Sequence, residues 1–556
     1  MRTNLSGLYV AEIRRKYKDR VYVTHLLRRS YREGGKVKQQ TLANLSALPP
    51  ETRELIRQSL RGQRFLPVEE GLEIVRSRSH GYVAAVRAMI RRLGLMELIA
   101  PQRCRERDLI EALLVARVLE PQTKLATTRW WQTTTLAEDL GLEGATEDEV
   151  YAAMDWLLAR QPQIEARLAR RHLGEGSLVL YDVSASHDEG THCPLAAFGH
   201  NREGRRGKRQ IWGLMTDEEG RPIAVEVFPG NTGDPSTVEA QVDKLKERFG
   251  LGRVVLAGDR GMLTQARIER LKAVGGIDWV SALRAPAIRR LAEQGSLQLS
   301  LFDEQDLAEI VSPDFPGERL IVCRNPFLAE NRARTRQELL EATEKRLQAL
   351  ARRVASGRLK RKEKIGQALG RILARSRMGK HFRFHIDEGA FRFERDEANI
   401  REEAALDGLY VLRTSVPKER WEPEQVVRGY KSLSHAERAF RTLKGVELRV
   451  RPIHHRLEDR VRAHTFLCLL AYYVEWHLRE AWRPLLFDDE EGGRHLDDSP
   501  VRPAVRSPGA LRKAATQPRP NGQPVHSFRT LLAELGTVVR NVARVPAIPN
   551  CHPLPW

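Results

Sequence analysis

The sequence predicts an α/β protein whose mixed sheet is interrupted by a long insertion. Apolar stretches typical of strands occur at 177–184, 209–230, 253–259 and 279–284, and the segments after 230 and after 259 follow a helical period. A further strand-like stretch appears only at 407–414, after a long segment of different composition. Strands and helices in this order are typical of one mixed sheet covered by helices.

The chain before this sheet divides into two predicted modules. Residues 7–45 alternate in three short runs, which predicts a small β-meander, and a helix is expected at 49–66. Residues 82–172 follow a helical period instead. We therefore expect a basic N-terminal β/α module at 1–80 and a helical module at 81–175.

The interruption of the sheet defines the remaining domain boundaries. We expect the first half of the core at 176–284, an insertion with long basic helices at 285–406, and the second half of the core at 407–485. Residues 486–556 are rich in Pro, Arg and Gly, which predicts a flexible tail or linker, with a short helix at 527–542.

Positive charge is concentrated in two blocks of this chain of 556 residues, whose net charge is +20. Residues 1–66 carry fifteen Lys or Arg against five Asp or Glu, and residues 326–381 carry sixteen against five. The rest of the chain is therefore close to neutral. Two concentrated basic blocks indicate a polyanionic partner, with nucleic acid as the first interpretation and an anionic membrane surface as the second.

Other composition features argue against membrane and secreted classes. The apolar run at 466–474 is too short to span a bilayer, and the N-terminus lacks the apolar core of a signal peptide. The five cysteines are scattered without a CxxC pair, so neither a disulfide framework nor a structural zinc site is indicated. We expect a cytoplasmic protein without a membrane partner.

A predicted helix carries a chemically distinctive stripe. Tyr430, Glu437 and Lys444 recur every seven residues, which is nearly two helical turns, so their side chains share one side of the helix. A second stripe is apolar and predicts the face by which this helix packs: Val426, Leu433 and Phe440. The alternative interpretation is a solvated face on which Glu437 pairs with Arg441.

Two further acids are expected where strands end. Asp182 follows LVLY and Asp259 follows VVLAG, although an acid at either place could also be a cap or turn residue. Together with Glu437 they could hold two divalent cations about 4 Å apart. All-oxygen ligands suit Mg²⁺ or Mn²⁺, and Lys444 is placed to meet a phosphate. Asp188 is the alternative to Asp182.

The sequence leaves the roles of several other polar residues open. The basic loop at 199–210 either lines DNA or is a solvated hairpin, and Asp234 and Glu226 are expected to be structural. The pair His454 and His455 has no acid partner at helical spacing, so we expect a structural or phosphate-positioning role rather than metal binding.

The order of these motifs resembles the DDE transposases of bacterial insertion sequences, in the branch with a Tyr–Arg–Glu–Lys helix signature. Tyr430, Glu437 and Lys444 match the signature spacing, and Leu433 stands at the Arg position. The stretches YDVSASHDEG and VVLAGDRGM resemble the motifs of the first and second aspartates. The resemblance implies a ribonuclease-H-like core split by an insertion, in which the catalytic and metal-binding residues are Asp182, Asp259 and Glu437.

The resemblance also implies an activity. It predicts a transposase that binds terminal inverted repeats as a homodimer on double-stranded DNA and catalyses cleavage and strand transfer with two Mg²⁺ or Mn²⁺ ions, in a bacterial, nucleoid-associated setting. The DNA-contacting residues would be Tyr430, Lys444, Arg438 and Arg441. Two alternatives remain, a ribonuclease-H-like structure-specific endonuclease and a non-catalytic DNA-binding protein derived from a transposase.

Overall fold

The chain forms two compact units, residues Met1–Arg78 with Val539–Trp556, and residues Ser79–Val538. The computed structural model describes residues 7–18, 20–63, 65, 73–190, 192–199, 207–297, 302, 306–490, 500–502, 505–515 and 522–544.

The first unit contains the predicted meander. Its strands form an antiparallel sheet in the order β1 (Leu8–Tyr17), β2 (Arg20–Glu33) and β3 (Lys36–Asn44). Helix α1 (Pro50–Leu60) follows, and Pro50 suits its first turn because that position needs no backbone N–H donor. A separate two-stranded ribbon pairs β4 (Glu73–Ser79) with β15 (Val539–Arg544).

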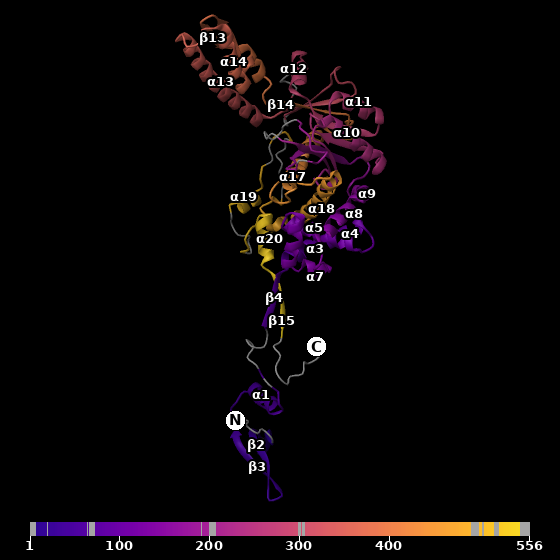
Figure 1. The fold of residues 1–556 in the computed structure, drawn as a ribbon, viewed down its shortest axis with the longest axis vertical. Coiled ribbons are helices and arrows are strands. Elements are labelled where there is room, and N and C mark those ends of the chain that lie inside the picture. Colours follow the sequence, from indigo (N-terminus) through magenta and orange to yellow (C-terminus); the bar gives the residue numbers. More distant parts are fainter. Residues whose placement is uncertain are drawn as a thin grey trace. The chain divides into compact units, whose positions relative to one another are not determined.

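The second unit begins with the predicted helical module. Its helices are α3 (Gly81–Arg92), α4 (Leu95–Ile99), α5 (Arg105–Leu119), α6 (Lys124–Trp130), α7 (Leu136–Leu140), α8 (Glu147–Leu158) and α9 (Gln161–His172). They share one hydrophobic core with α18 (Glu458–Trp482), beside which they lie in Figure 1. Both α5 and α18 are buried along most of their length, which explains why their apolar residues extend all round the helix.

One mixed sheet of eight strands confirms the predicted fold class. Its order is β10 (Leu307–Ile310), β11 (Arg319–Arg324), β14 (Leu409–Thr414), β9 (Ile277–Ala282), β8 (Val254–Gly258), β5 (Leu178–His187), β6 (Arg209–Asp217) and β7 (Pro222–Pro229). The central pairs β5–β8 and β8–β9 are parallel, and the other pairs are antiparallel.

Helices cover this sheet, and the alternation of side chains along its strands separates two cores. One core contains Val179, Tyr181 and Leu256 and includes residues of α10 (Asp234–Asp243) and α11 (Gln265–Val274). The other contains Leu180 and Ala257 and includes residues of α16 (Pro423–Lys431) and α17 (Leu433–Lys444). Successive strand residues point to opposite faces, so the second group of helices faces the even-numbered residues of β5.

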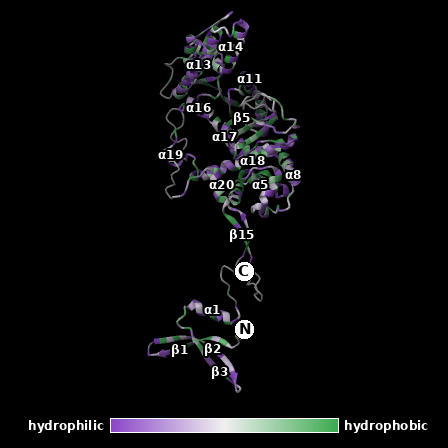
Figure 2. Ribbon diagram, turned by 60° about the vertical axis from the view of Figure 1, so that its left-hand side comes forward, coloured by the Kyte–Doolittle hydropathy of each residue, from purple (hydrophilic) through white to green (hydrophobic). Residues whose placement is uncertain are grey.

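The segment between β9 and β14 contains a small subdomain. After α12 (Ala285–Glu293), strands β10 and β11 join the main sheet, and then α13 (Pro326–Ala355), α14 (Lys362–Ser376), β12 (Phe382–Asp387), β13 (Ala390–Arg395) and α15 (Glu397–Ala404) follow. These later elements have their own core, which includes the leucines whose period predicted a long helix: Leu340, Leu347 and Leu350. Hydrophilic residues are frequent along α13 and α14 in Figure 2.

Two expectations for the C-terminal region are wrong. The helix predicted at 527–542 ends early as α20 (Phe528–Gly536), because β15 pairs with β4 from residue 539 onward. Within the segment predicted as a flexible tail, α19 (Pro508–Ala514) forms, and Leu486 and Val501 are buried. None of the helices that the structure describes combines the length and hydrophobicity needed to cross a bilayer.

Candidate active site

Two aspartates occupy adjacent positions on neighbouring strands of the main sheet. Strands β5 and β8 run parallel, and the last pair of their ladder joins Tyr181 to Gly258. Asp182 and Asp259 are the next residues along the two strands. Because neighbouring strands are about 4.8 Å apart, the two carboxylates leave the backbone from adjacent positions.

The two aspartates differ in their place along the strand. Asp259 directly follows β8, as predicted. The prediction that Asp182 ends its strand is wrong, because β5 continues to His187 by pairing with β6. Each carboxylate accepts a hydrogen bond from the backbone N–H of the following residue, at 2.7 Å for Asp182 and 2.8 Å for Asp259.

Both aspartates lie on the sheet face that α16 and α17 cover. Leu180 and Ala257 precede them by two residues and belong to the core shared with these helices. Since alternate strand residues point the same way, Asp182 and Asp259 continue this face beyond the apolar core. The sheet thus directs both carboxylates toward the side on which Glu437 lies.

The apolar stripe predicted for the Glu437 helix packs as expected. Val426 is fully buried, Phe440 is 6% exposed, and Leu433 is half-buried. Ser432 separates α16 from α17, so the predicted helix is two helices, although the near-helical φ of −60° and ψ of −18° at Ser432 preserve its course. Glu437 is exposed, and it makes no hydrogen bond or ion pair with any residue that the structure describes.

Tyr430 lies where the negative charges of all three acids act on it. Burial raises the pKa of the Tyr430 phenol to about 12, with further contributions from the carboxylates of Asp259, Glu437 and Asp182. The guanidinium of Arg260 opposes this increase. The charges of these acids, on β5, directly after β8 and on α17, therefore all lie within electrostatic range of one phenol.

Lys444 occupies a position that the sequence did not predict. Its ammonium donates a hydrogen bond of 2.5 Å to the backbone oxygen of Ala185 and lies 6.0 Å from the ring centroid of Trp212. This contact joins the end of α17 to the strand that carries Asp182. In this structure Lys444 therefore helps to position α17 against β5.

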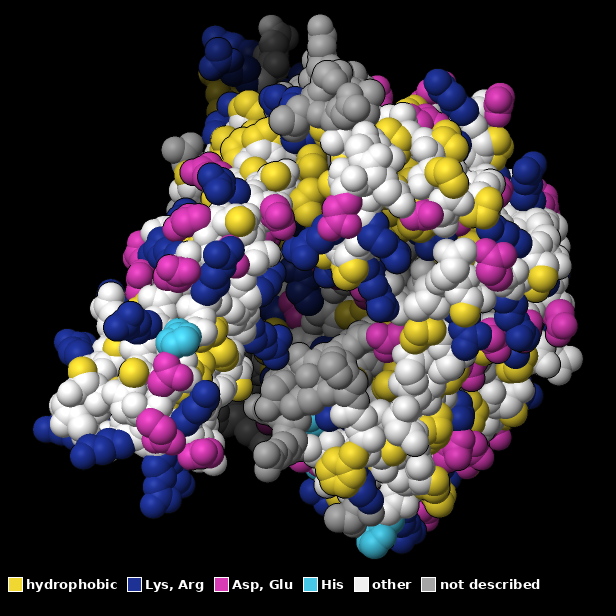
Figure 3. All heavy atoms as spheres, turned by 90° about the horizontal axis from the view of Figure 1, so that it is seen from above, with side chains coloured by type: hydrophobic (Ala, Val, Ile, Leu, Met, Phe, Trp, Pro, Cys, Tyr) yellow, Lys and Arg dark blue, Asp and Glu magenta, His cyan; other side chains and the backbone are white. Residues whose placement is uncertain are grey.

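Some of the cationic residues near the site were not predicted from the sequence. Arg438 and Arg441 are exposed on α17, and Leu433 packs apolarly at the position where the signature has Arg. Arg260 lies near Tyr430. Its position directly after Asp259 is the sequence feature that could have indicated it as a site residue. On the face in Figure 3, several Lys and Arg side chains surround a hollow.

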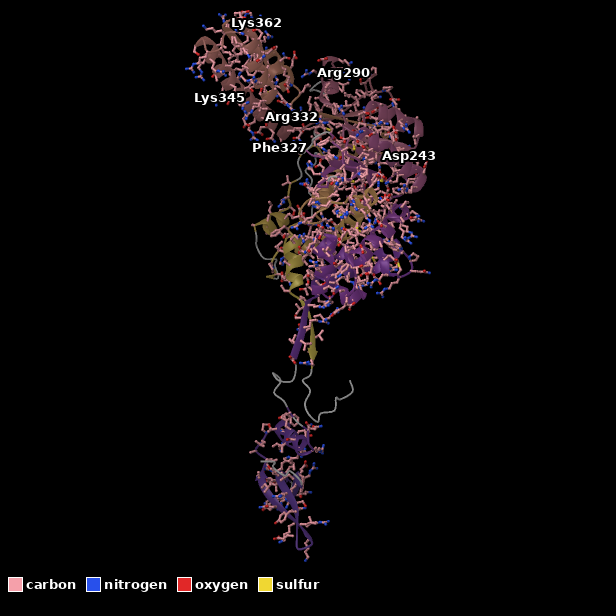
Figure 4. All side chains as sticks on the ribbon, in the orientation of Figure 1. Asp243, Arg290, Phe327, Arg332, Lys345 and Lys362 are labelled. Carbon is pink, nitrogen blue, oxygen red and sulfur yellow. The ribbon has the colours of Figure 1, made fainter. Side chains whose placement is uncertain are left out.

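A cavity of about 350 Å³ opens beside this group of acids. Asp259, Arg260 and Tyr430 line it together with Arg332 of α13 and residues of β14 and α12. Figure 4 labels Arg332 at the end of α13 nearer the main sheet and Lys345 farther along the helix. The base of the inserted subdomain thus contributes a cation to the edge of the candidate site.

The competing acids have structural partners. Asp188 is 9% exposed and accepts hydrogen bonds from the backbone N–H of Gly190 at 2.6 Å and from Gln210 Nε2 at 2.8 Å. Glu226 accepts a hydrogen bond of 2.9 Å from Lys244. These contacts give Asp188 and Glu226 structural roles in the sheet region.

Of the remaining candidates, Asp234 and His455 have structural positions. Asp234 is the first residue of α10. His455 is packed against Tyr151 and His464, and burial lowers its pKa to about 3. Residues 200–206 of the predicted basic loop lie outside the described residues.

The donor set suits a hard divalent cation. Three carboxylates supply only oxygen ligands, which Mg²⁺ and Mn²⁺ prefer, and exposed Glu437 has no competing partner among the described residues. In the described part of the chain, no three His, Cys, Asp or Glu side chains already form a group that could hold an ion. Coordination by all three acids therefore requires their side chains to approach one another.

Comparison with known proteins identifies two families. One described as "Transposase DDE domain" matches residues 189–474, and one described as "IS1634 family transposase, N-terminal domain" matches residues 10–68. The first match covers just over half of the chain; it includes Asp259 and Glu437 and begins after Asp182. No curated protein matches the chain.

Proposed function

Because the chain belongs to the transposases with a DDE domain, we propose that it binds the terminal inverted repeats of an insertion sequence, cuts the DNA at these ends and joins 3′-hydroxyls to target DNA. Two ends must be held together during this reaction, so the active form is a homodimer on double-stranded DNA. Its substrate lies in the bacterial cytoplasm, in the nucleoid.

The observation that carries this proposal is the placement of three acids on the same side of the main sheet, within electrostatic range of Tyr430. Asp182 and Asp259 leave adjacent strands on one face of the sheet, and Glu437 lies on the helix pair that covers that face. All three raise the pKa of the Tyr430 phenol. Carboxylates from two strands and one helix around a single region are the donor set that the proposed chemistry requires.

Asp182, Asp259 and Glu437 would hold two Mg²⁺ or Mn²⁺ ions. When bound, such ions lower the pKa of an attacking water or hydroxyl and stabilise charge on the leaving oxygen. Tyr430 carries its phenolic proton at neutral pH, as tyrosine ordinarily does, and its raised pKa extends this to more alkaline solution, so it can donate a hydrogen bond to a phosphate oxygen.

The exposed cations of this region orient the DNA backbone. Arg438 and Arg441 project from α17, and Arg260 follows Asp259. Their guanidinium groups can contact phosphate oxygens through paired N–H donors. Lys444 acts differently, by fixing the end of α17 to the backbone of β5 and so maintaining the distance between Glu437 and Asp182.

The test is cleavage and strand transfer on DNA that carries the element's ends, with Mg²⁺ or Mn²⁺ and then with EDTA. We expect Glu437→Gln and Asp259→Asn each to lower the cleavage rate at least about 100-fold while end binding persists, because each removes a charged oxygen ligand. Glu424→Gln is the matched control, since it neutralises another acid of the same helix pair, in the first turn of α16.

The outcomes distinguish the three proposed functions: a transposase, an endonuclease and a non-catalytic DNA-binding protein. Full activity of Glu437→Gln would remove this residue from the chemistry and contradict the proposed site. Cutting without joining by the wild-type protein would indicate a structure-specific endonuclease. Specific binding without cutting would indicate a non-catalytic DNA-binding protein.

A further inference from the structure

The three-stranded sheet of the first unit ends in a two-stranded ribbon. Strand β1 pairs with β2 from Leu8–Arg29 to Tyr17–Arg20, whereas β3 pairs only with residues 26–33 of β2. Residues 14–17 and 20–23 therefore extend past β3 with no third strand beside them. These residues, with Lys18, are called the ribbon tip below.

The ribbon tip is exposed on both faces. Every described residue of it is exposed, including Tyr17 at 68%, Tyr22 at 54% and Val21 at 59%. Large apolar and aromatic side chains on an uncovered ribbon are typical of a surface that meets a partner. The exposure of both faces distinguishes the tip from residues 24–28 of β2, which are half-buried.

Charge identifies the kind of partner. Residues 14–23 contain five Lys or Arg and one acid, Asp19, whereas residues 30–39, at the opposite hairpin of the sheet, contain three Lys or Arg and one acid. Each end has an ion pair: Arg14 of the tip is paired with Glu12 at 2.7 Å, and Lys38 of the opposite hairpin with Glu33 at 2.5 Å. The β1–β2 tip is therefore the more basic end of the sheet and fits a polyanion.

The dimensions of the tip fit double-stranded DNA. The major groove is about 12 Å wide and 8.5 Å deep and admits a two-stranded ribbon. At about 3.4 Å per residue, the four residue pairs of the tip extend roughly 13 Å beyond β3. The tip can therefore reach the base edges before β3 meets the phosphate backbone.

The two faces of the tip carry different chemistry. Arg15 opposes Tyr22 and Arg20 opposes Tyr17, so one face presents two guanidinium groups and two phenols. The other face presents the pairs Arg14–Val23 and Lys16–Val21. Arginine donates two parallel hydrogen bonds to guanine, which makes the first face suited to reading bases.

We propose that the ribbon tip enters the major groove at the transposon ends, with Arg15 and Arg20 reading base edges while Arg14 and Lys16 contact phosphates. This assignment rests on the proposed function, because it takes the end DNA as the ligand. It places sequence recognition in the strands of the first unit, and it leaves α1 as a support for the sheet.

The experiment compares two variants of the full chain that each remove two cations from the same ribbon. Binding to end DNA and to scrambled DNA of equal length is measured at several salt concentrations without divalent ions. We expect Arg15→Ala/Arg20→Ala to lower the preference for end DNA at least about 25-fold. Arg14→Ala/Lys16→Ala should weaken binding to both DNAs equally. It should also reduce the slope of log K against log salt concentration by about two.

Lys36→Ala/Lys38→Ala, at the opposite hairpin, is a further control and should retain the preference for end DNA. All six side chains are exposed, so the variants should unfold at the wild-type temperature, which circular dichroism can check. Unchanged preference in Arg15→Ala/Arg20→Ala, with the wild type binding ends specifically, would overturn the ribbon assignment alone. A wild-type protein that neither prefers nor cuts end DNA would instead overturn the proposed function.

Discussion

At the level of single residues, the pKa of Tyr430 tests whether Asp182, Asp259 and Glu437 lie near it, and the test needs no activity assay. After burial, the carboxylate of Asp259 contributes most to the raised pKa of its phenol, and Glu437 and Asp182 contribute less. Removing a nearby negative charge makes ionisation of the phenol easier. The pKa of Tyr430 should therefore fall in Asp259→Asn, and by less in Glu437→Gln.

The titration can be followed by ¹⁹F NMR with 3-fluorotyrosine at position 430, whose phenol is more acidic than that of tyrosine. Glu424→Gln is again the control and should leave the pKa of this group unchanged. Identical titration curves in Asp259→Asn and the unsubstituted protein would show that these side chains are not close in solution.

Lys124 makes the stability of the helical module dependent on pH. Its ammonium lies 3.2 Å from His464 Nδ1, inside a buried group that also contains Arg117, Cys468 and His455. Burial and then the charge of Arg117 lower the pKa of Lys124 to about 7. Between this value and the ordinary lysine pKa of about 10.4, the unfolded chain binds more protons than the folded chain.

Stability should therefore rise with pH above about 7, by up to about 1.4 kcal/mol per pH unit from this group. Lys124→Met should remove most of this slope, because the unfolded chain then has no extra proton to bind at this position. Urea unfolding at pH 7, 8 and 9 measures the slope. Lys345→Met, at an exposed position of α13, should retain the wild-type slope.

At the element scale, the inserted subdomain is attached through neighbouring points of the chain. The backbone N–H of Asn325 donates a hydrogen bond of 2.9 Å to the oxygen of Gly408, and Arg336 pairs with Asp407. Gly408 has a φ of +78°, and a Cβ there would lie 2.5 Å from the oxygen of Asn325. Only glycine allows the two chain segments to approach this closely.

We predict that a Gly-Gly linker can replace Pro326–Asp407 without unfolding the main sheet, since the ends to be joined are already adjacent. The shortened chain should bind DNA more weakly and with a smaller salt dependence, because it loses the second basic block. Far-UV circular dichroism and binding at two salt concentrations measure these effects. A shortened chain that is unfolded would show that the subdomain is part of the core.

The elements that the sequence predicted well are those with a strong local pattern. The leucines of α13 and the alternating residues of β1 to β3 each indicate their own secondary structure. Strand β10 has only four residues, and β4 depends on a partner near the other end of the chain, so neither had a sufficient local signal. The Lys444 contact with Ala185 depends on how α17 packs on β5, which spacing alone does not define.

The candidate site was predictable to the same extent. The types and approximate places of Asp182, Asp259 and Glu437 follow from the sequence, and so does the apolar stripe beneath the helix. The register that aligns Tyr181 with Gly258, and with it the adjacency of the two aspartates, depends on pairing between strands about 75 residues apart. Such pairing is a property of the folded sheet.

At the scale of the whole molecule, residues near the C-terminus complete the core of the second unit. Phe528, Leu531 and Leu532 of α20 belong to the hydrophobic core of the helical module. Arg529 donates hydrogen bonds to the backbone oxygens of Leu119, Val446 and Glu447. One short helix thus connects α5 with the segment that follows α17.

Leu532→Ala should lower the free energy of unfolding by about 2–5 kcal/mol, because it removes buried methyl groups and leaves a cavity. Leu511→Ala on α19 is the control, since Leu511 is 55% exposed and its truncation should cost less than about 0.5 kcal/mol. Denaturant unfolding of both variants measures the difference. Equal stability of the two variants would contradict the packing of α20 in the core.

The pairing of β4 with β15 also has a consequence for synthesis of the chain. Strand β4 ends at Ser79, and β15 begins at Val539. At about 5–20 residues per second, a ribosome needs roughly 20–90 s to translate the intervening residues. During that interval β4 cannot pair with β15. A message truncated before codon 539 yields a protein that can never form this pair. Only a chain translated through Arg544 acquires the complete pairing of β4 with β15.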